Sequence, residues 1–478
     1  MTLSVEQTLQ ADYLVIGAGA VGLAFADTIV TESAATVVIV DRAESPGGHW
    51  TTAYPFVRLH QPAAYYGVNS RDLGTGVIED SGDNVGLYEL AGVDEIRSYY
   101  DTVMLDLTGS RRVRHFASSE YHGDRTFTTA SGERIAVDVG RRVVDTTHSK
   151  VIVPSMRPPT FLVGPGVDCV PPNALPRSAP GHDHFVVIGG GKTGMDSCLW
   201  LLRNGISPER IAWIVPRESW LLDRANVQPG TEFADRIKVA FGARLEAIAA
   251  ADSVDDLFAR LEMSGSLLRL HADVEPTMYR CATVTQAEAA QLRRITDVVR
   301  MGHVHEITAA GAVLGSGELN ADTSTLWIDC AAEGLGGGPS TTIFSGSALT
   351  PQCVRACQQV FSAAFIAHVE LTYDDDVTKN ALCEPIHLPG EPLDWLTMSV
   401  IEYRNQINWF AEPQLMEWLH SSRLNAIGAM MAPVMERRPR IRQRVFDAIA
   451  AELHAANDKL DDLLAADAAT HAAAGSSP

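Results

Sequence analysis

The chain has 478 residues and a formal net charge of −21, and its pI is near 5.1. A chain of this length exceeds what one hydrophobic core usually holds, so we expect about two or three domains. The acidic balance disfavours nucleic acid as a partner, because it would be repelled. Apolar runs are shorter than about 18 residues, and residues 1–10 lack the basic and apolar parts of a signal peptide. We therefore expect no membrane span and no leader.

The 7 cysteines are scattered without a C-x-x-C spacing or a metal-ligand pattern. A chain this long does not need disulfides to fold, so we expect a reducing, cytoplasmic location and no metal site. Cys353 and Cys357 are one helical turn apart in an apolar stretch. We interpret them as packing residues of a helix core.

A β-α-β pattern opens the chain. Apolar residues 11–16 predict a strand, residues 20–30 a helix and residues 36–40 a second strand. The strand runs directly into a glycine-rich turn, which is the context of a dinucleotide-binding unit.

That turn carries a G-x-G-x-x-G motif formed by Gly17, Gly19 and Gly22. The first glycine permits the tight turn, the second lets the backbone approach a pyrophosphate, and the third lets helix and strand pack closely. The helix N-terminus adds positive potential for phosphates. Asp41 ends the second strand, where its carboxylate can accept both ribose hydroxyls, and Arg42 follows it. These residues predict a dinucleotide site.

Proline and glycine crowd residues 154–180, which predicts a break in regular structure and a crossing into a second domain. A second β-α-β pattern follows, with a strand at residues 185–188, a helix at 193–204 and a strand at 211–215. The turn between this strand and helix repeats the glycine motif. Its expected cofactor contacts are Gly189, Gly191, Lys192, Thr193 and Gly194.

Arg217, preceded by a proline, follows the second strand of this unit where an acid would favour NADH. An arginine there would pair with a 2′-phosphate, so we predict NADPH as the reductant. The alternative is a surface arginine that binds no phosphate.

The rest of the chain predicts a buried strand at residues 326–330, a flexible glycine turn at 333–338 and a helix at 354–370. Residues 395–464 are expected to be mostly helical. The prolines at which we expect breaks are Pro413, Pro433 and Pro439, and residues 465–478 are expected to form a disordered tail.

Two glycine units in this order, with Gly47-Gly48-His49-Trp50 after the first, resemble flavin-dependent monooxygenases of the flavin-containing and Baeyer–Villiger type. The likeness continues through Tyr54-Pro55, Arg58 and Tyr65-Tyr66. It implies an α/β fold with two Rossmann-like dinucleotide-binding domains, the NADP domain being inserted in the FAD domain, and a mainly helical C-terminal region. The implied segments are an FAD-binding part at residues 1–180 and an NAD(P)H-binding domain at 181–340. The chain then returns to the FAD-binding domain at 341–375, and the helical region at 376–464 and the tail at 465–478 follow.

The resemblance places Gly48, His49 and Trp50 along the FAD and makes His60 and Arg58 the candidate catalytic residues. His60 stands where the family usually has an aspartate, and its ring could donate a hydrogen bond to an oxygenated flavin. The alternatives are a structural histidine and, for Trp50, a core tryptophan.

The Baeyer–Villiger fingerprint expected before the second unit is missing from residues 161–176. We therefore expect heteroatom oxygenation or hydroxylation of a small organic substrate rather than ketone-to-ester chemistry. The expected cofactors are FAD and NADPH, and dioxygen would react through a C4a-peroxyflavin. The alternatives are a non-oxygenating NAD(P)H-dependent flavin dehydrogenase or reductase and a flavin-holding redox sensor or scaffold. Flavin disulfide reductases are disfavoured, because the sequence spacing shows no redox cysteine pair.

Overall fold

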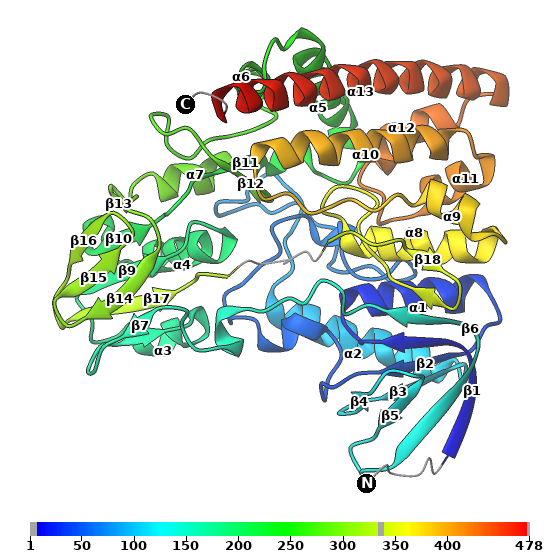
Figure 1. Ribbon diagram of the computed structural model, residues 1–478, viewed down its shortest axis with the longest axis horizontal. Coiled ribbons are helices and arrows are strands. Elements are labelled where there is room, and N and C mark those ends of the chain that lie inside the picture. The colour runs from blue at the N-terminus through cyan, green and yellow to red at the C-terminus, as the bar shows by residue number, and fades with distance from the viewer. Residues whose placement is uncertain (1–6, 333–338, 476–478) are drawn as a thin grey trace.

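The computed structural model describes residues 7–332 and 339–475. The chain forms two large sheets and two smaller ones, with helices between and above them (Figure 1). The glycine turn expected at 333–338 lies outside the described residues. No helix in the described ranges is long and apolar enough to cross a membrane.

The first sheet contains β1, the strand that leads into the first glycine motif. Its strands are β1 (Gln7–Ile16), β2 (Val37–Val40), β3 (Val113–Phe116), β4 (Glu120–Tyr121), β5 (Thr126–Thr128), β6 (Arg134–Asp145), β18 (Phe344–Ser345) and β19 (Ala348–Leu349). The order along the sheet is β18-β19-β6-β1-β2-β3, and β1 pairs in parallel with β2 and β6. Helix α1 (Ala20–Glu32) connects β1 to β2, as the sequence pattern predicts. Helix α2 (Val93–Gly109) precedes β3.

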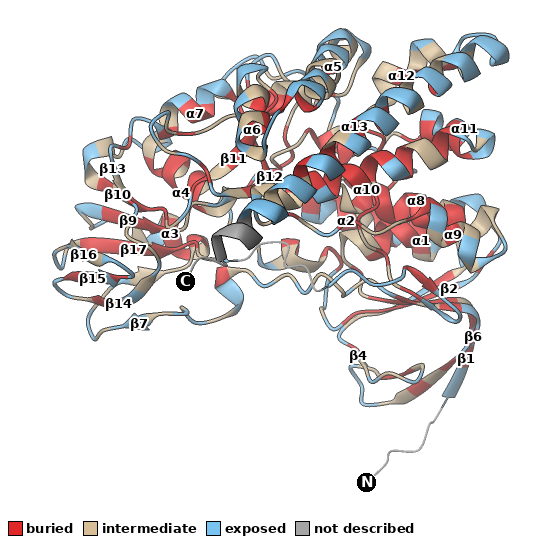
Figure 2. Cartoon of the chain, turned by 45° about the horizontal axis from the view of Figure 1, so that its top comes forward, coloured by how far each residue is buried: buried red, intermediate tan, exposed pale blue. Residues whose placement is uncertain are grey.

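The chain returns to this sheet after the second unit. β19 pairs in parallel with β6, and α8 (Gln359–Thr372) packs along α1. Helix α1 is therefore covered by the sheet on one side and by α8 on the other, which explains why it is apolar nearly all round. Figure 2 shows both helices mostly buried.

The helix expected at 354–370 begins only at Gln359. Cys357 adopts a left-handed backbone with φ of 55°, which an L residue in a right-handed helix cannot do. The prediction that Cys353 and Cys357 share one helix face is therefore wrong.

The second sheet is wholly parallel, in the order β13-β10-β9-β17-β8. Its strands are β8 (Cys169–Val170), β9 (His184–Ile188), β10 (Ile211–Ile214), β13 (Asp297–Val299) and β17 (Thr325–Asp329). Helices α3 (Leu175–Ser178), α4 (Lys192–Arg203) and α7 (Gln286–Leu292) accompany it. A smaller sheet packs against it and contains β7 (Leu162–Val163), β14 (Val304–Thr308), β15 (Gly311–Leu314) and β16 (Gly317–Asn320). The two Rossmann-like units expected from the sequence are confirmed.

A parallel strand pair, β11 (Ser219–Asp223) and β12 (Met278–Val284), leaves this second unit. Between the two strands lie helices α5 (Ala234–Ala250) and α6 (Val254–Met263). The C-terminal part is helical, as expected. Its helices are α9 (Asp376–Leu382), α10 (Pro392–Phe410), α11 (Pro413–Ser421), α12 (Gly428–Met435) and α13 (Pro439–Gly475). Helix α13 lies along α10 and reaches α5 (Figure 1).

Two details of the helical region differ from expectation. Pro433 lies inside α12, which continues to Met435 before the chain breaks, whereas Pro413 and Pro439 each begin a helix. The stretch from residue 465 to 475, expected as a disordered tail, continues α13. Alanine is abundant there, and it has the highest intrinsic helix propensity. The division of the chain at residues 180, 340 and 375 remains our proposal.

Candidate functional site

The first glycine motif separates glycines that the fold needs from one that it does not. Gly17 has a φ of +103°, and a Cβ on Gly22 would lie 2.1 Å from the carbonyl oxygen of Gly17. Both positions therefore require glycine. A Cβ on Gly19, at the N-terminus of α1, would meet only Gly48, at an ordinary contact distance of 3.6 Å. Among the described residues, only the backbone of Gly48 comes within contact distance of the space over Gly19.

The carboxylate of Asp41 lies at the carboxyl end of β2, against the glycine turn. It is buried and accepts hydrogen bonds from the backbone N–H groups of Ala18 and Ala43. Arg42 beside it is exposed. The structure therefore brings Asp41 together with the first motif and leaves Arg42 at the surface.

The Gly48-His49-Trp50 stretch forms a short 3-10 helix (Gly48–Thr52) against the first motif. Trp50 is buried in the core, and its indole N–H donates to the hydroxyl of Tyr66 at 2.8 Å. Burial lowers the pKa of His49 to about 4, so this ring is neutral at neutral pH. These contacts favour the core-tryptophan alternative for Trp50.

Polar side chains that the sequence analysis missed meet at the N-terminal ends of α1 and α8. Val21 of α1 and Gln359 of α8 line one pocket, which His148 and Ser149 border beyond the end of β6. The side chains of Gln358 and Gln359 each bury one polar atom, Oε1 and Nε2, without a partner in the described part of the chain. A buried amide without a partner is costly, and a polar ligand would satisfy it. A polar pair placed just after a parallel strand could have signalled this edge.

The second glycine motif repeats the geometry of the first. Gly189 has a φ of +116°, and a Cβ on Gly194 would lie 1.9 Å from the carbonyl oxygen of Gly189. A Cβ on Gly191 would meet no atom of the described residues within 4 Å. Gly191 is thus the counterpart of the open Gly19, and it begins α4 as its N-cap.

The side chains after this motif connect the two units. Lys192 forms an ion pair with Asp196 on the next turn of α4, close to Thr193. The hydroxyl of Tyr54, from the first unit, donates to Asp196 at 2.7 Å. Burial and the Asp196 carboxylate raise the pKa of Tyr54, so its hydroxyl stays protonated.

Arg217 leaves the carboxyl end of β10 but is not free in this structure. Its Nε donates to the hydroxyl of Thr277 at 3.0 Å, and its guanidinium lies 3.1 Å from a carboxylate oxygen of Glu391. The side chain is 40% exposed, so an incoming phosphate can reach it but competes with Glu391.

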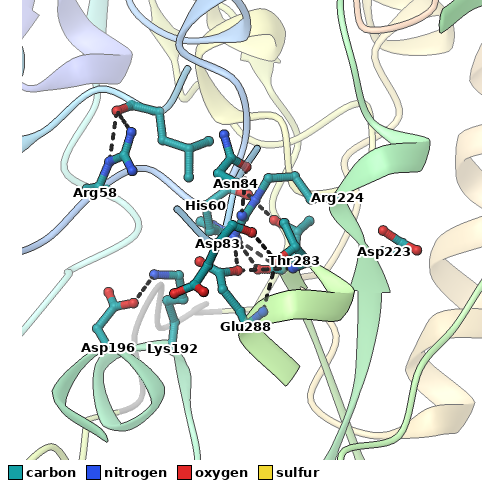
Figure 3. A network of polar contacts seen from close by, with 12 residues as sticks. Arg58, His60, Asp83, Asn84, Lys192, Asp196, Asp223, Arg224, Thr283 and Glu288 are labelled. Carbon is teal, nitrogen blue, oxygen red and sulfur yellow. Dashed lines mark hydrogen bonds and ion pairs between the residues drawn. The ribbon is translucent and has the colours of Figure 1, made fainter. Parts of the chain in front are cut away.

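His60 lies where the loop of the first unit meets β12 (Figure 3). The backbone N–H of Thr283 donates to Nδ1 of His60 at 3.2 Å, which places the imidazole proton on Nε2. Burial, reinforced by the charges of Lys192 and Arg224, lowers the pKa of His60 to about 3. The ring is therefore a neutral donor throughout the physiological range.

Arg224 holds this region together and was not found from the sequence. It is fully buried, and its guanidinium donates to the side chain of Asn84 and to the backbone of His60 and Thr283. It also forms an ion pair with Glu288 at 2.7 Å. Burial alone would raise the pKa of Glu288, but Arg224 and a backbone N–H together hold it below its usual range. No local sequence pattern indicates contacts between segments so far apart.

Arg58, predicted as catalytic, is not part of this cluster. Its guanidinium donates to the backbone carbonyl of Leu90 at 3.0 Å and pairs with Glu79, and the side chain is 42% exposed. Figure 3 shows it apart from His60. Arg58 and His60 therefore lie apart in this structure, and a catalytic role for Arg58 stays a prediction.

The structure also corrects the reading of the cysteines. Cys281 of β12 and Cys357 before α8 form a disulfide, with Cα atoms 6.5 Å apart and a sequence separation of 76. The pair is assembled by the fold and leaves no spacing motif in the chain.

Comparison with known proteins places the chain in a family. The model of the NAD(P)-binding Rossmann-like domain matches residues 15–70. The chain is 53% identical over 465 residues to the uncharacterized protein Rv2000 of Mycobacterium tuberculosis (strain ATCC 25618 / H37Rv), covering 97% of this chain and 86% of that protein. The chain belongs to the Rv2000 family. Protein Mb2023 of Mycobacterium bovis shows the same identity and coverage.

Solved structures similar to this Rv2000 relative include flavin enzymes. Cyclohexanone monooxygenase from Rhodococcus sp. Phi1 bound to NADP+ has a TM-score of 0.46 and 14% identity, covering 76% of this chain and 83% of that one. A flavin-containing monooxygenase from Stenotrophomonas maltophilia has a TM-score of 0.42 and 14% identity, covering 73% and 88%. The functional argument for this chain therefore rests on its own geometry.

Proposed function

We propose that this chain is an FAD-dependent, NADPH-consuming monooxygenase that transfers one oxygen atom from dioxygen to a small organic substrate. The observation that carries the proposal is the pairing of Gly19 and Gly191. Each is the second glycine of its motif, each begins a helix at the carboxyl edge of a parallel sheet, and neither is required by contacts with the part of the chain that the structure describes. Space left at a helix N-terminus suits a pyrophosphate.

The residues present fit FAD at the first motif. Gly19 would face the pyrophosphate, Asp41 would accept from the ribose, and the unpartnered amides of Gln358 and Gln359 would meet polar groups farther along the cofactor. Bound FAD supplies two-electron transfer and reaction with dioxygen. In this proposal Gly17 and Gly22 shape the turn that binds FAD. The residues that support the turn are Gly48, His49 and Trp50.

NADPH fits the second motif. Gly191 and the N-terminus of α4 would bind its pyrophosphate, while Arg217 would bind the 2′-phosphate after leaving Glu391. Lys192 lies close enough to His60 for its charge to lower the pKa of that ring. His60 would thus lie near the proposed NADPH site, and its neutral Nε2–H is a donor for negative charge that develops during oxygen activation.

The test uses purified protein reconstituted with FAD. After anaerobic reduction by NADPH, rapid mixing with dioxygen should produce a transient flavin absorbance before the oxidised spectrum returns. Turnover with labelled dioxygen and a panel containing a thioether, an amine, an aromatic compound and a ketone should put one labelled atom into product. We expect the thioether, amine or aromatic compound to react before the ketone, at a cytoplasmic pH.

The alternative function is a non-oxygenating NAD(P)H-dependent flavin dehydrogenase or reductase. In that case the reduced flavin would return to its oxidised spectrum in a single phase, and peroxide would equal the NADPH consumed for every compound in the panel. Failure of NADPH to reduce bound flavin would contradict both functions and leave a sensor or scaffold.

A further inference from the structure

The disulfide between Cys281 and Cys357 lies between elements that carry the two proposed cofactor sites. Cys357 comes just before α8, whose first residue, Gln359, lines the same pocket as Val21 at the start of α1. On the other side, Thr283 follows Cys281 along β12 and donates its N–H to His60. The disulfide thus joins the end of the proposed flavin site to the strand that holds the candidate catalytic histidine.

The backbone presents both cysteines in an unusual conformation. Cys281 has a φ of 54° and Cys357 a φ of 55°, both in the left-handed region that disfavours non-glycine residues. Such conformations are strained and are concentrated at functional sites. Two of them at the two ends of one disulfide indicate that the fold positions this pair for more than packing.

A bulge in the strand pair aims Cys281 toward α8. Trp220 pairs with Tyr279 and Leu222 pairs with Thr283, so β12 has more residues than β11 between these two residue pairs. A bulge of this kind redirects the side chain within it. Cys281 is 7% exposed and Cys357 is only partly buried, so Cys357 is the more accessible end of the pair.

Two buried ionisable residues lie close to Cys357, one of them two positions before it in sequence and the other at the backbone of its preceding residue. Arg355 is buried two positions before Cys357, with its guanidinium over the ring of Phe361, and burial lowers its pKa to about 10, which leaves it charged at neutral pH. Glu402 accepts a hydrogen bond from the backbone of Ala356, and burial raises its pKa.

We propose that Cys281 and Cys357 form a redox-active disulfide that accepts two electrons from the reduced flavin. The proposal rests on the function proposed above, because it needs NADPH and FAD as the electron source. A hydride from NADPH reduces the flavin, and the flavin passes an electron pair into the sulfur–sulfur bond, which breaks. With one proton from solvent the sum is NADPH, H⁺ and disulfide giving NADP⁺ and two thiols.

The pair gives the chain a second two-electron store. An oxidised chain would take up two equivalents of NADPH, one for the flavin and one for the disulfide, before the flavin stays fully reduced. Reduction would also release the loop before α8 from β12. The oxidation state of the two cysteines would therefore affect the structure of the proposed flavin site. The chemical class of acceptor is thus a protein disulfide of the same chain.

The experiment is an anaerobic NADPH titration of the full-length, FAD-loaded protein, with maleimide labelling and mass spectrometry of each cysteine. We expect complete flavin bleaching at two equivalents of NADPH, with new labelling confined to Cys281 and Cys357. The Cys357→Ser variant should bind FAD normally and bleach at one equivalent. The matched control Cys169→Ser removes a free, partly exposed cysteine of β8 and should still need two.

The outcomes separate the two proposals. Bleaching at one equivalent, with both cysteines unlabelled until dithiothreitol is added, would overturn the redox role and leave the proposed cofactor sites intact. Protein without FAD should keep the disulfide in the presence of NADPH; its reduction there would also overturn transfer through the flavin. A chain that binds no FAD, or whose flavin NADPH cannot reduce, would overturn both. Wild-type labelling decides the matter even if Cys357→Ser fails to fold.

Discussion

The Nε of Arg224 donates a hydrogen bond to the backbone carbonyl oxygen of His60, 2.9 Å away, across 164 positions of sequence. The second unit therefore fixes the backbone of a residue that belongs to the first. Because the same guanidinium is paired with Glu288, the placement of His60 depends on a buried charge and on the carboxylate that balances it.

Replacing Glu288 with glutamine should therefore destabilise the protein. The substitution leaves Arg224 buried without its counter-charge, and breaking one side of a buried pair costs about 3 kcal/mol. Urea unfolding followed by circular dichroism would measure the loss. Glu384→Gln, which breaks an exposed pair with Arg404, should change stability by less than about 1 kcal/mol. Equal effects of the two variants would contradict the central role of Arg224.

Gly19→Ala should fold normally but lose FAD. Its Cβ meets only Gly48 at 3.6 Å within the protein, so the new methyl group should obstruct the pyrophosphate and not the fold. Flavin content after reconstitution, from the absorbance spectrum, and the unfolding temperature give the two readouts. Gly22→Ala is the contrast, because its Cβ would lie 2.1 Å from a carbonyl oxygen and should cost about 3 kcal/mol of stability. Full FAD occupancy in Gly19→Ala would refute the placement of the site.

Arg217→Ala should weaken NADPH binding while sparing NADH. A charge-assisted hydrogen bond to phosphate is worth about 1.5–3 kcal/mol, or roughly one to two decades in affinity. Anaerobic flavin reduction at varied cofactor concentration measures both constants. Glu391→Gln removes the competing carboxylate that lies 3.1 Å from Arg217 and should strengthen NADPH binding modestly. Parallel losses for NADPH and NADH in Arg217→Ala would show that the arginine does not read the 2′-phosphate.

His60→Ala should keep FAD and NADPH reduction but release more peroxide. The variant removes the neutral Nε2–H donor proposed to stabilise negative charge during oxygen activation. Loss of one positioned donor costs on the order of 3 kcal/mol, which is about a hundredfold in lifetime. Stopped-flow absorbance and a peroxide assay measure the change. His60→Gln retains a donor and should recover part of the lifetime, whereas loss of flavin in His60→Ala would point to a structural role.

His60 should also make the protein less stable in acid. Its pKa is about 3 in the folded chain, below the ordinary value of 6.5, so the unfolded chain binds more protons between these values. Stability is therefore full above pH 6.5 and falls as the pH drops toward 3, by up to about 1.4 kcal/mol per pH unit. Thermal unfolding of His60→Gln from pH 4 to 7 should show a shallower slope. His122→Gln, at an exposed position, should keep the wild-type slope.

Much of the fold follows from local sequence patterns. The strands around both glycine motifs and the helices after them lie close to their predicted positions, because buried parallel strands and amphipathic helices have short-range signatures. The start of α8 was predicted too early, because an apolar stretch alone does not reveal the left-handed backbone at Cys357.

The site was less predictable than the fold. Motif glycines act through local sterics and could be found, but the Arg224 network and the Cys281–Cys357 pair are created by contacts between distant segments. The pairing of Arg58 with Glu79 likewise becomes visible only when the loops are folded. Long-range pairing is the physical step that a single sequence leaves open.

The late return of α8 to α1 has a consequence for how the protein is made. The helix that covers the outer side of α1 ends at Thr372, so it leaves the ribosome long after Glu32 at the end of α1. At about 5–20 residues per second this interval lasts on the order of tens of seconds. Synthesis of the second unit is finished during that time, while the apolar outer face of α1 is still uncovered. We expect chaperones that bind exposed apolar surface to cover this face during synthesis. We also expect the inserted second unit to fold before the first unit, which surrounds it in sequence.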